Sequence, residues 1–215
     1  MANRVAVVGV GQTKHKSKHK DVSIAGLVRQ AAERALADAG CEWRDIDALV
    51  LGKAPDMFEG MTMPELYLTD ALGGNGKPVI RVHTAGSVGG STAIVAANYV
   101  QSGRYNRVLT VTFEKQSESN ATWALSPRMP FVPHVNAGAG GFFAPYMRQY
   151  METYKAPDHI GCMVAVKDRL NACRNPYAHL QIPNIDLAMV QQSPMLWEPL
   201  RFLEPRETET RKMHA

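Results

Sequence analysis

Short apolar runs alternate with helical segments through the first half of the sequence, and this alternation restricts the fold more than any other feature. An apolar run that ends at a glycine or a turn is typical of a buried strand, whereas apolar positions three and four residues apart indicate a helix. Strands connected by helices form parallel sheets. The expected fold is therefore α/β, with a mixed, mainly parallel sheet that carries helices on both faces. The predicted strands are residues 5–10, 47–52, 78–83 and 107–113, and the predicted helices are residues 23–39, 63–72 and 86–101.

The second half of the sequence has a different character. Residues 138–154 and 158–175 are predicted to form two helices with no strand between them. We expect one domain over residues 1–204, with a mainly helical region at about 115–200. Residues 205–215 are polar and lack apolar periodicity, so an irregular tail is expected there.

The positive charge of the chain is concentrated in one segment. The formal net charge is +4, and residues 14–20 alone contain four lysines. Such a run is either a solvated loop or a loop that attracts phosphate groups. Elsewhere no basic stripe is interleaved with aromatic residues, so a nucleic-acid partner is not expected.

The sequence favours a cytoplasmic protein without a bound metal or cofactor. No stretch approaches the roughly 18 apolar residues that a membrane-spanning helix needs. The first four residues lead directly into a predicted strand, which leaves no room for a secretory signal. The cysteines Cys41, Cys162 and Cys173 fit no zinc or redox spacing, so reduced thiols are expected. His15 and His19 have no further ligand at a metal-binding spacing.

A glycine pair after the first predicted strand invites comparison with dinucleotide-binding folds. Gly9-Val10-Gly11 lacks the third glycine of that fingerprint, and the lysine- and histidine-rich segment that follows cannot open a closely packed helix. We therefore reject a dinucleotide site at this position.

The turn between the third predicted strand and its following helix is the best candidate for a site. The strand ends at His83, and a helix rich in small residues begins within three positions. Such a turn exposes the side chain at its tip, and the start of the helix offers unpaired N–H groups to a ligand. Enzymes use this geometry for nucleophiles and oxyanion sites, although Gly/Ala/Ser helices also serve for tight packing alone. The candidate ligand contacts beside His83 are Thr84, Gly86 and Ser87.

Four segments, in order and at suitable distances, resemble the thiolase superfamily, specifically the sterol-carrier-protein-x thiolases and related actinobacterial lipid-transfer proteins. They are residues 5–13, residues 83–87, Phe113-Glu114-Lys115, and Asn175-Pro176-Tyr177 preceded by Lys167. The resemblance covers residues 4 to about 204. It implies the N-terminal half of a thiolase-like fold, an acyl-CoA substrate, and an acyltransferase family that acts in lipid or steroid metabolism.

The chain departs from this family in two ways, which leave open whether it is an enzyme. The family has its nucleophilic cysteine at the position of His83, and imidazole does not replace a thiolate that must carry an acyl group. Related proteins without that cysteine include steroid side-chain aldolases, so retro-aldol cleavage of a carbon–carbon bond becomes the expected chemistry. Beyond about residue 204, nothing resembles the family's C-terminal half, which is expected to be absent. The alternative function is a non-catalytic acyl-CoA-binding or lipid-transfer subunit.

The resemblance also implies partners and further contacts. In the superfamily the strand that leads to position 83 pairs across a dimer axis, so a homodimer is expected. The family's aldolases also work with a small zinc-ribbon/oligonucleotide-fold partner protein. His134, Gly138 and Gly140 are further candidates for substrate contact, with a structural loop role as the alternative for His134. His83 itself is expected at the tip of a buried strand and away from the open surface.

Overall fold

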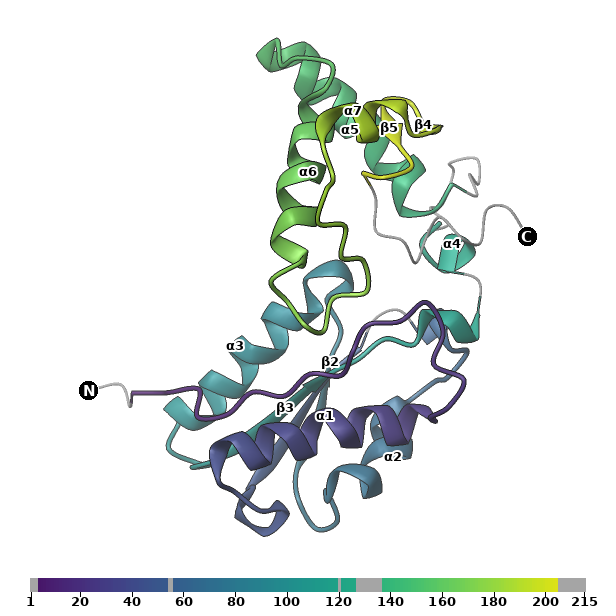
Figure 1. Ribbon diagram of the computed structural model, residues 1–215. Coiled ribbons are helices and arrows are strands. Elements are labelled where there is room, and N and C mark those ends of the chain that lie inside the picture. Colours follow the sequence, from purple (N-terminus) through teal and green to yellow (C-terminus); the bar gives the residue numbers. More distant parts are fainter. Residues whose placement is uncertain (1–3, 54–55, 120, 127–136, 205–215) are drawn as a thin grey trace. The chain divides into compact units, whose positions relative to one another are not determined.

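The computed structural model describes residues 4–53, 56–119, 121–126 and 137–204 (Figure 1). Its contacts divide the chain into two compact units. The first comprises Met1–Thr13 and Lys18–Glu118, and the second comprises Lys14–Ser17 and Ser119–Ala215. Each unit is described by itself below.

The first unit is built on a parallel sheet of three described strands. The strands β1 (Ala48–Gly52), β2 (Val79–Val82) and β3 (Val108–Thr112) lie in the order β2-β1-β3. In the register of this sheet, Gly52 lies opposite both Val82 and Thr112. The helices of the unit are α1 (Ile24–Ala39), α2 (Pro64–Leu68) and α3 (Val88–Gln101). The predicted α/β fold is confirmed for this unit, since β1, β2 and β3 follow three of the predicted strands.

Opposite faces of the sheet pack against different helices. Leu49 and Leu51 of β1 belong to a core that includes Val28 and Leu36 of α1. Val50, whose side chain points the other way, packs with Ala96 of α3. Successive residues of a strand alternate between the two faces, so this division follows from the apolar sequence of β1, which is buried throughout. The prediction of helices on both faces is therefore correct.

Helix α1 begins and ends where its capping residues predict. The Ser23 side chain accepts a hydrogen bond from the Gly26 amide at 3.1 Å. Gly40 has a positive φ of 63°, and its amide donates back to carbonyls of the last turn. A left-handed residue at this position ends a helix at little cost only when it is glycine.

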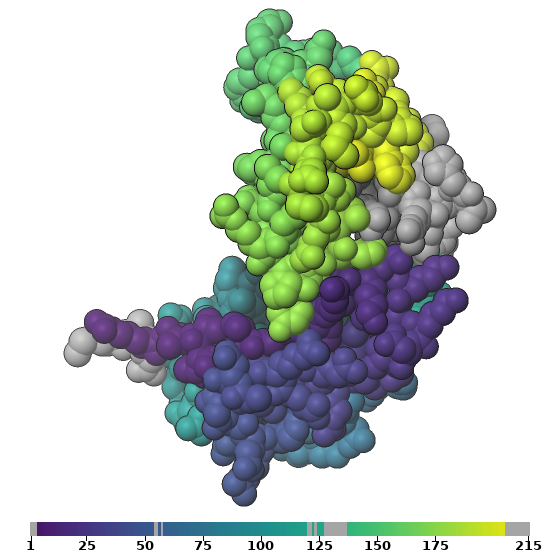
Figure 2. Space-filling model, viewed as in Figure 1, coloured from purple at the N-terminus to yellow at the C-terminus, as the bar shows by residue number. Residues whose placement is uncertain are grey.

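The predicted strand at residues 5–10 is wrong. Residues 4–10 are extended but pair with no described strand, and Val7, Val8 and Val10 are 83%, 68% and 70% exposed. Figure 2 shows this segment at the surface. Gly9 lies so close to α1 that a Cβ there would be 2.4 Å from the Ala35 carbonyl oxygen. The Val10 amide donates to Asp38 of α1 at 2.9 Å. Gly9 therefore allows this segment to pack closely against α1, and it does not mark the end of a strand in the sheet.

The second unit is mainly helical. Its helices are α4 (Ala121–Ala124), α5 (Gly138–Tyr154), α6 (Ile160–Ala172) and α7 (Leu187–Gln192), followed by an antiparallel hairpin of β4 (Met195–Trp197) and β5 (Leu200–Arg201). The predicted helices at 138–154 and 158–175 are confirmed. The hairpin was not predicted, because strands of three and two residues are too short to show an alternating pattern. The predicted tail at 205–215 lies outside the described residues.

A small core holds α6 and α7 together. It contains Cys162, Ala165, Ile185 and Val190, all buried. Cys162 is thus a packing residue of this core, whereas Cys173 is only half-buried. No helix of the described residues has both the length and the apolar character that crossing a membrane requires.

Candidate functional site

The carboxyl ends of the three parallel strands bring chemically capable residues to one edge of the sheet. Lys53 follows β1, His83 follows β2, and Glu114 comes two residues after β3. The Lys53 amide donates to the Val82 carbonyl, and the Phe113 amide donates to the Gly52 carbonyl, both at 3.3 Å. These bonds hold the three strand ends side by side. In parallel α/β sheets, ligands bind outside the carboxyl ends of the strands.

The predicted strand-to-helix turn is present. A single 3₁₀ turn (Ala85–Ser87) connects the residues after β2 directly to α3. Inside the turn, the Thr84 hydroxyl lies 2.9 Å from the Ser91 hydroxyl, and the Ser87 hydroxyl donates to the Thr84 carbonyl at 2.8 Å. Ala85 has a positive φ of 47°, a conformation that costs a residue with a Cβ about 1 kcal/mol. His83, Thr84, Gly86 and Ser87 therefore lie together in a tight and strained turn.

His83 lies on the open surface, so the expectation that it would be shielded is wrong. The residues from His83 to Ser87 are all exposed. A Cβ built on Gly86, Gly89 or Gly90 would meet no heavy atom within 4 Å. No described residue covers the small-residue face at the start of α3, which is the physical reason for the exposure. Polar groups at this turn are therefore accessible to a ligand.

The other predicted contact residues belong to the second unit. Gly138 is buried with a positive φ of 60°, and its amide donates to the Ser126 hydroxyl at 2.8 Å. A Cβ on Gly140 would lie 3.2 Å from the Trp197 ring, so this glycine allows close packing of α5 on β4. His134 lies outside the described residues. A substrate role for these three residues stays a prediction.

A buried charge cluster at the same edge was not predicted from the sequence. Lys53 is only 1% exposed, and its ammonium group lies 2.7 Å from the carboxylates of both Glu59 and Glu114. The rings of Phe58 and Phe113 lie 5.2 and 5.9 Å from the same nitrogen. The available signal was a lysine placed directly after a fully apolar strand, at the end where parallel sheets carry their sites.

A second lysine joins this cluster to the segment before α1. The Lys115 amide donates to Glu59, and its ammonium group lies 2.6 Å from Glu118. The same ammonium group donates to the Val22 carbonyl at 2.9 Å. Residues just ahead of α1 are therefore fixed at the carboxyl edge of the sheet.

The edge thus contains two parts with different chemical capacities. In the Lys53 cluster the ammonium group is buried between two carboxylates, so it is not exposed to a ligand. The turn at His83 presents an imidazole and two hydroxyl groups to solvent. An imidazole there can donate a hydrogen bond to a carbonyl oxygen or accept a proton. Among the described residues, no group of three or more His, Cys, Asp or Glu side chains could hold a metal ion.

The Cys162 thiol lies in the second unit, in the core between α6 and α7. Burial raises the pKa of the Cys162 thiol to about 11, and the hydrogen bond to Glu204 at 3.2 Å adds to this effect. The Glu204 carboxylate also accepts from the Arg201 amide, which fixes it beside the thiol. The Cys162 thiol is therefore protonated at neutral pH and cannot serve as a nucleophile.

This arrangement predicts an order of alkylation. In the folded protein at pH 7.5, iodoacetamide should modify Cys162 at least about tenfold more slowly than Cys41 or Cys173, because the thiolate is the reactive form. Peptide mass spectrometry over time measures the three rates, and urea-unfolded protein is the control in which they should converge. Modification of Cys162 as fast as the half-buried thiols would contradict this account.

Solved structures and curated proteins are similar to this chain over most of its length. A solved structure described as "Ltp2-ChsH2(DUF35) aldolase" matches with a TM-score of 0.70 and 27% sequence identity, over 92% of this chain and 51% of that chain. The 17-hydroxy-3-oxo-4-pregnene-20-carboxyl-CoA lyase of Mycobacterium tuberculosis is 27% identical over 222 residues, which cover 95% of this chain and 54% of the lyase. Sterol carrier protein 2 of Gallus gallus is 25% identical over 224 residues, which cover 95% of this chain and 39% of that protein. The chain thus spans about half, or less, of the length of these relatives.

The family match extends across both units. Residues 5–167 match the family described as "Thiolase, N-terminal domain". This range is more than half of the chain, and it includes the turn at His83. The chain therefore belongs to the thiolase N-terminal domain family.

Proposed function

We propose that this protein acts on a steroid or lipid acyl-CoA and cleaves a carbon–carbon bond in a hydroxyacyl-CoA by a retro-aldol reaction. The observation that carries the proposal is His83 at the strand-to-helix turn where the family resemblance places a nucleophilic cysteine. Of the cysteines in the chain, Cys41 follows α1, Cys162 lies within α6, and Cys173 ends α6. The turn therefore offers no thiol for a covalent acyl intermediate. Two relatives, one named as a carboxyl-CoA lyase and the other as an aldolase, support the same chemistry.

In the proposed step, a base removes the proton from the substrate's hydroxyl group and the carbon–carbon bond next to it breaks. A ketone is released, and the bonding electrons pass to the thioester as an enolate. Protonation of that enolate carbon gives the shortened acyl-CoA. His83 donates a hydrogen bond to the thioester oxygen, where negative charge develops, and the start of α3 adds its positive dipole end.

A direct test is to incubate the protein with a hydroxyacyl-CoA of a steroid side chain and to follow the ketone and the shortened acyl-CoA by liquid chromatography and mass spectrometry. Release is expected, and His83→Ala should lower kcat/KM by about 100-fold, as loss of one oxyanion donor does. His179→Ala, a half-buried histidine of the second unit, is the control and should leave kcat/KM within about twofold. Release that is unaffected by His83→Ala would contradict the assigned role.

The second candidate function is a non-catalytic acyl-CoA-binding or lipid-transfer subunit. The open position of His83 favours it, because an exposed turn does not exclude water from a reaction. The same experiment separates the two functions: tight binding of the hydroxyacyl-CoA without any release of products supports the subunit.

Assembly is part of the proposal. β2 is an edge strand of the described sheet, so its free edge is available for pairing with a second copy across a dimer axis. The description of the similar solved structure, "Ltp2-ChsH2(DUF35) aldolase", joins two protein names, which supports the existence of a partner protein. We propose that this partner is a small zinc-ribbon/oligonucleotide-fold protein. The three cysteines are free thiols, which supports a cytoplasmic location.

A further inference from the structure

The lysine-rich segment ahead of α1 has an alternating pattern of exposure. Lysines occupy positions 14, 16, 18 and 20, and all four are exposed. Of the residues between them, Ser17 and His19 are half-buried and His15 is exposed. The segment is therefore not uniformly solvated, because Ser17 and His19 are partly covered while the four lysines are exposed.

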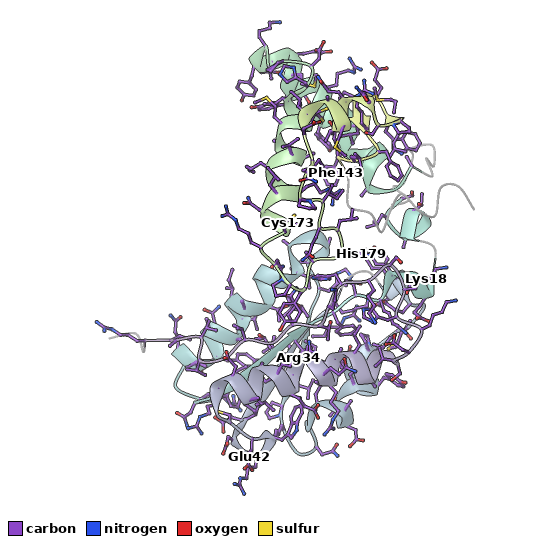
Figure 3. The ribbon with its side chains drawn as sticks, viewed as in Figure 1. Lys18, Arg34, Glu42, Phe143, Cys173 and His179 are labelled. Atoms are coloured by element: carbon purple, nitrogen blue, oxygen red, sulfur yellow. The ribbon has the colours of Figure 1, made fainter. Side chains whose placement is uncertain are left out.

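The second part of this segment leads to the carboxyl edge of the sheet, which the chain contacts at Val22. Lys18 and Lys20 belong to the first unit, and Lys18 is labelled in Figure 3. Val22, two residues after Lys20, accepts the 2.9 Å hydrogen bond from Lys115, which follows β3. Lys18 and Lys20 are thus attached, through two to four residues of chain, to the edge that carries His83.

Lys18 and Lys20 are exposed cations, whereas the lysines that follow β1 and β3 are buried and paired with carboxylates. The carboxylates of Glu59 and Glu114 are occupied by Lys53, and that of Glu118 is occupied by Lys115. Residues 14–20 contain no acid, and the first carboxylate after them is Asp21, which lies 3.9 Å from His19. The segment itself therefore carries only positive charge, and this exposed charge attracts a polyvalent anion.

We propose that Lys18 and Lys20 bind the phosphate groups of the nucleotide part of an acyl-CoA whose thioester lies at the His83 turn. This inference rests on the proposed function, which supplies the acyl-CoA. Coenzyme A carries a 3′-phosphate and a diphosphate at one end and the thioester at the other, joined by a flexible arm. A single acyl-CoA can therefore contact Lys18 and Lys20 with its phosphates and the His83 turn with its thioester. Lysine acts on phosphate as a compact point charge and needs no fixed geometry, which suits an exposed segment.

The test compares ligands that differ in phosphate. The double variant Lys18→Gln/Lys20→Gln should bind acetyl-CoA about tenfold more weakly than the wild type by isothermal titration calorimetry. The loss should be smaller for 3′-dephospho-acetyl-CoA and should shrink in both cases as salt is raised, because exposed charges are screened. Arg44→Gln/Arg104→Gln is the matched control. It removes two exposed cations of the same unit at the amino ends of β1 and β3, and it should bind acetyl-CoA like the wild type.

Adenosine 3′,5′-bisphosphate separates failure of this inference from failure of the proposed function. Equal acetyl-CoA affinity in the Lys18/Lys20 variant and the wild type would overturn the phosphate contact and leave the proposed function intact. Wild-type binding of the bisphosphate and of acetyl-CoA, both weakened in the variant, together with no release of products from a hydroxyacyl-CoA, would overturn the proposed carbon–carbon cleavage alone. Binding of neither probe would overturn both. Tighter binding of duplex DNA or of phosphatidylglycerol vesicles than of acetyl-CoA, lost in the same variant, would assign the lysines to a different partner.

Discussion

Replacing Lys53 with methionine should lower the free energy of unfolding by about 3–5 kcal/mol, the cost of leaving buried charges without their partner. The ammonium group is 2.7 Å from two carboxylates, and Glu59 is itself only 1% exposed. Methionine keeps most of the apolar volume of the lysine stem, so the loss would come from the uncompensated carboxylates and not from a cavity. Chemical denaturation followed by circular dichroism measures the change.

Two controls separate burial from charge in this prediction. Arg44→Gln breaks an exposed pair with Glu42, in which the side chains are 78% and 67% exposed, and should change stability by less than about 1 kcal/mol. Adding Glu59→Gln and Glu114→Gln to Lys53→Met should recover part of the loss, because neutral amides are less costly to bury than carboxylates. A loss below about 1 kcal/mol for Lys53→Met would mean that water reaches the cluster and that the charges are not sealed.

Local signals predicted the elements of the fold well where the cause of the structure is itself local. Helix α1 begins at the Ser23 cap and ends at Gly40, because capping depends on residues within a few positions. The strand expected at residues 5–10 failed for the opposite reason. An apolar run followed by glycine has the same sequence signature whether it pairs in a sheet or lies along a helix. Only the close approach of Gly9 to α1 distinguishes the two.

The candidate site was predicted only in part, for a similar reason. The turn at His83 is encoded in one continuous stretch, and its strand, tight connection and helix all appear as expected. The Lys53 cluster draws its charged groups from positions 53, 59 and 114, which only the parallel register brings together. No spacing along the chain links these positions. The exposure of His83 also depends on what surrounds the turn, which its own sequence does not contain.

Intact-mass spectrometry after incubation with acetyl-CoA should find no stable acetyl adduct on the wild-type protein, whereas His83→Cys should gain one acetyl group. A thiol at this turn lies just ahead of the start of α3, where the positive end of the helix dipole favours the thiolate, the form that attacks a thioester. Imidazole at the same position does not hold an acyl group stably. The adduct on His83→Cys should be removed by hydroxylamine, as a thioester is.

Ser87→Cys, which places an exposed thiol on the same turn, is the matched control for this prediction. It should acetylate much more slowly than His83→Cys if position 83 is where the thioester lies. Equal acetylation of both variants would mean only that exposed thiols react with acetyl-CoA. An adduct on the wild-type chain would overturn the non-covalent chemistry proposed for this protein, because the retro-aldol reaction needs no acyl-enzyme.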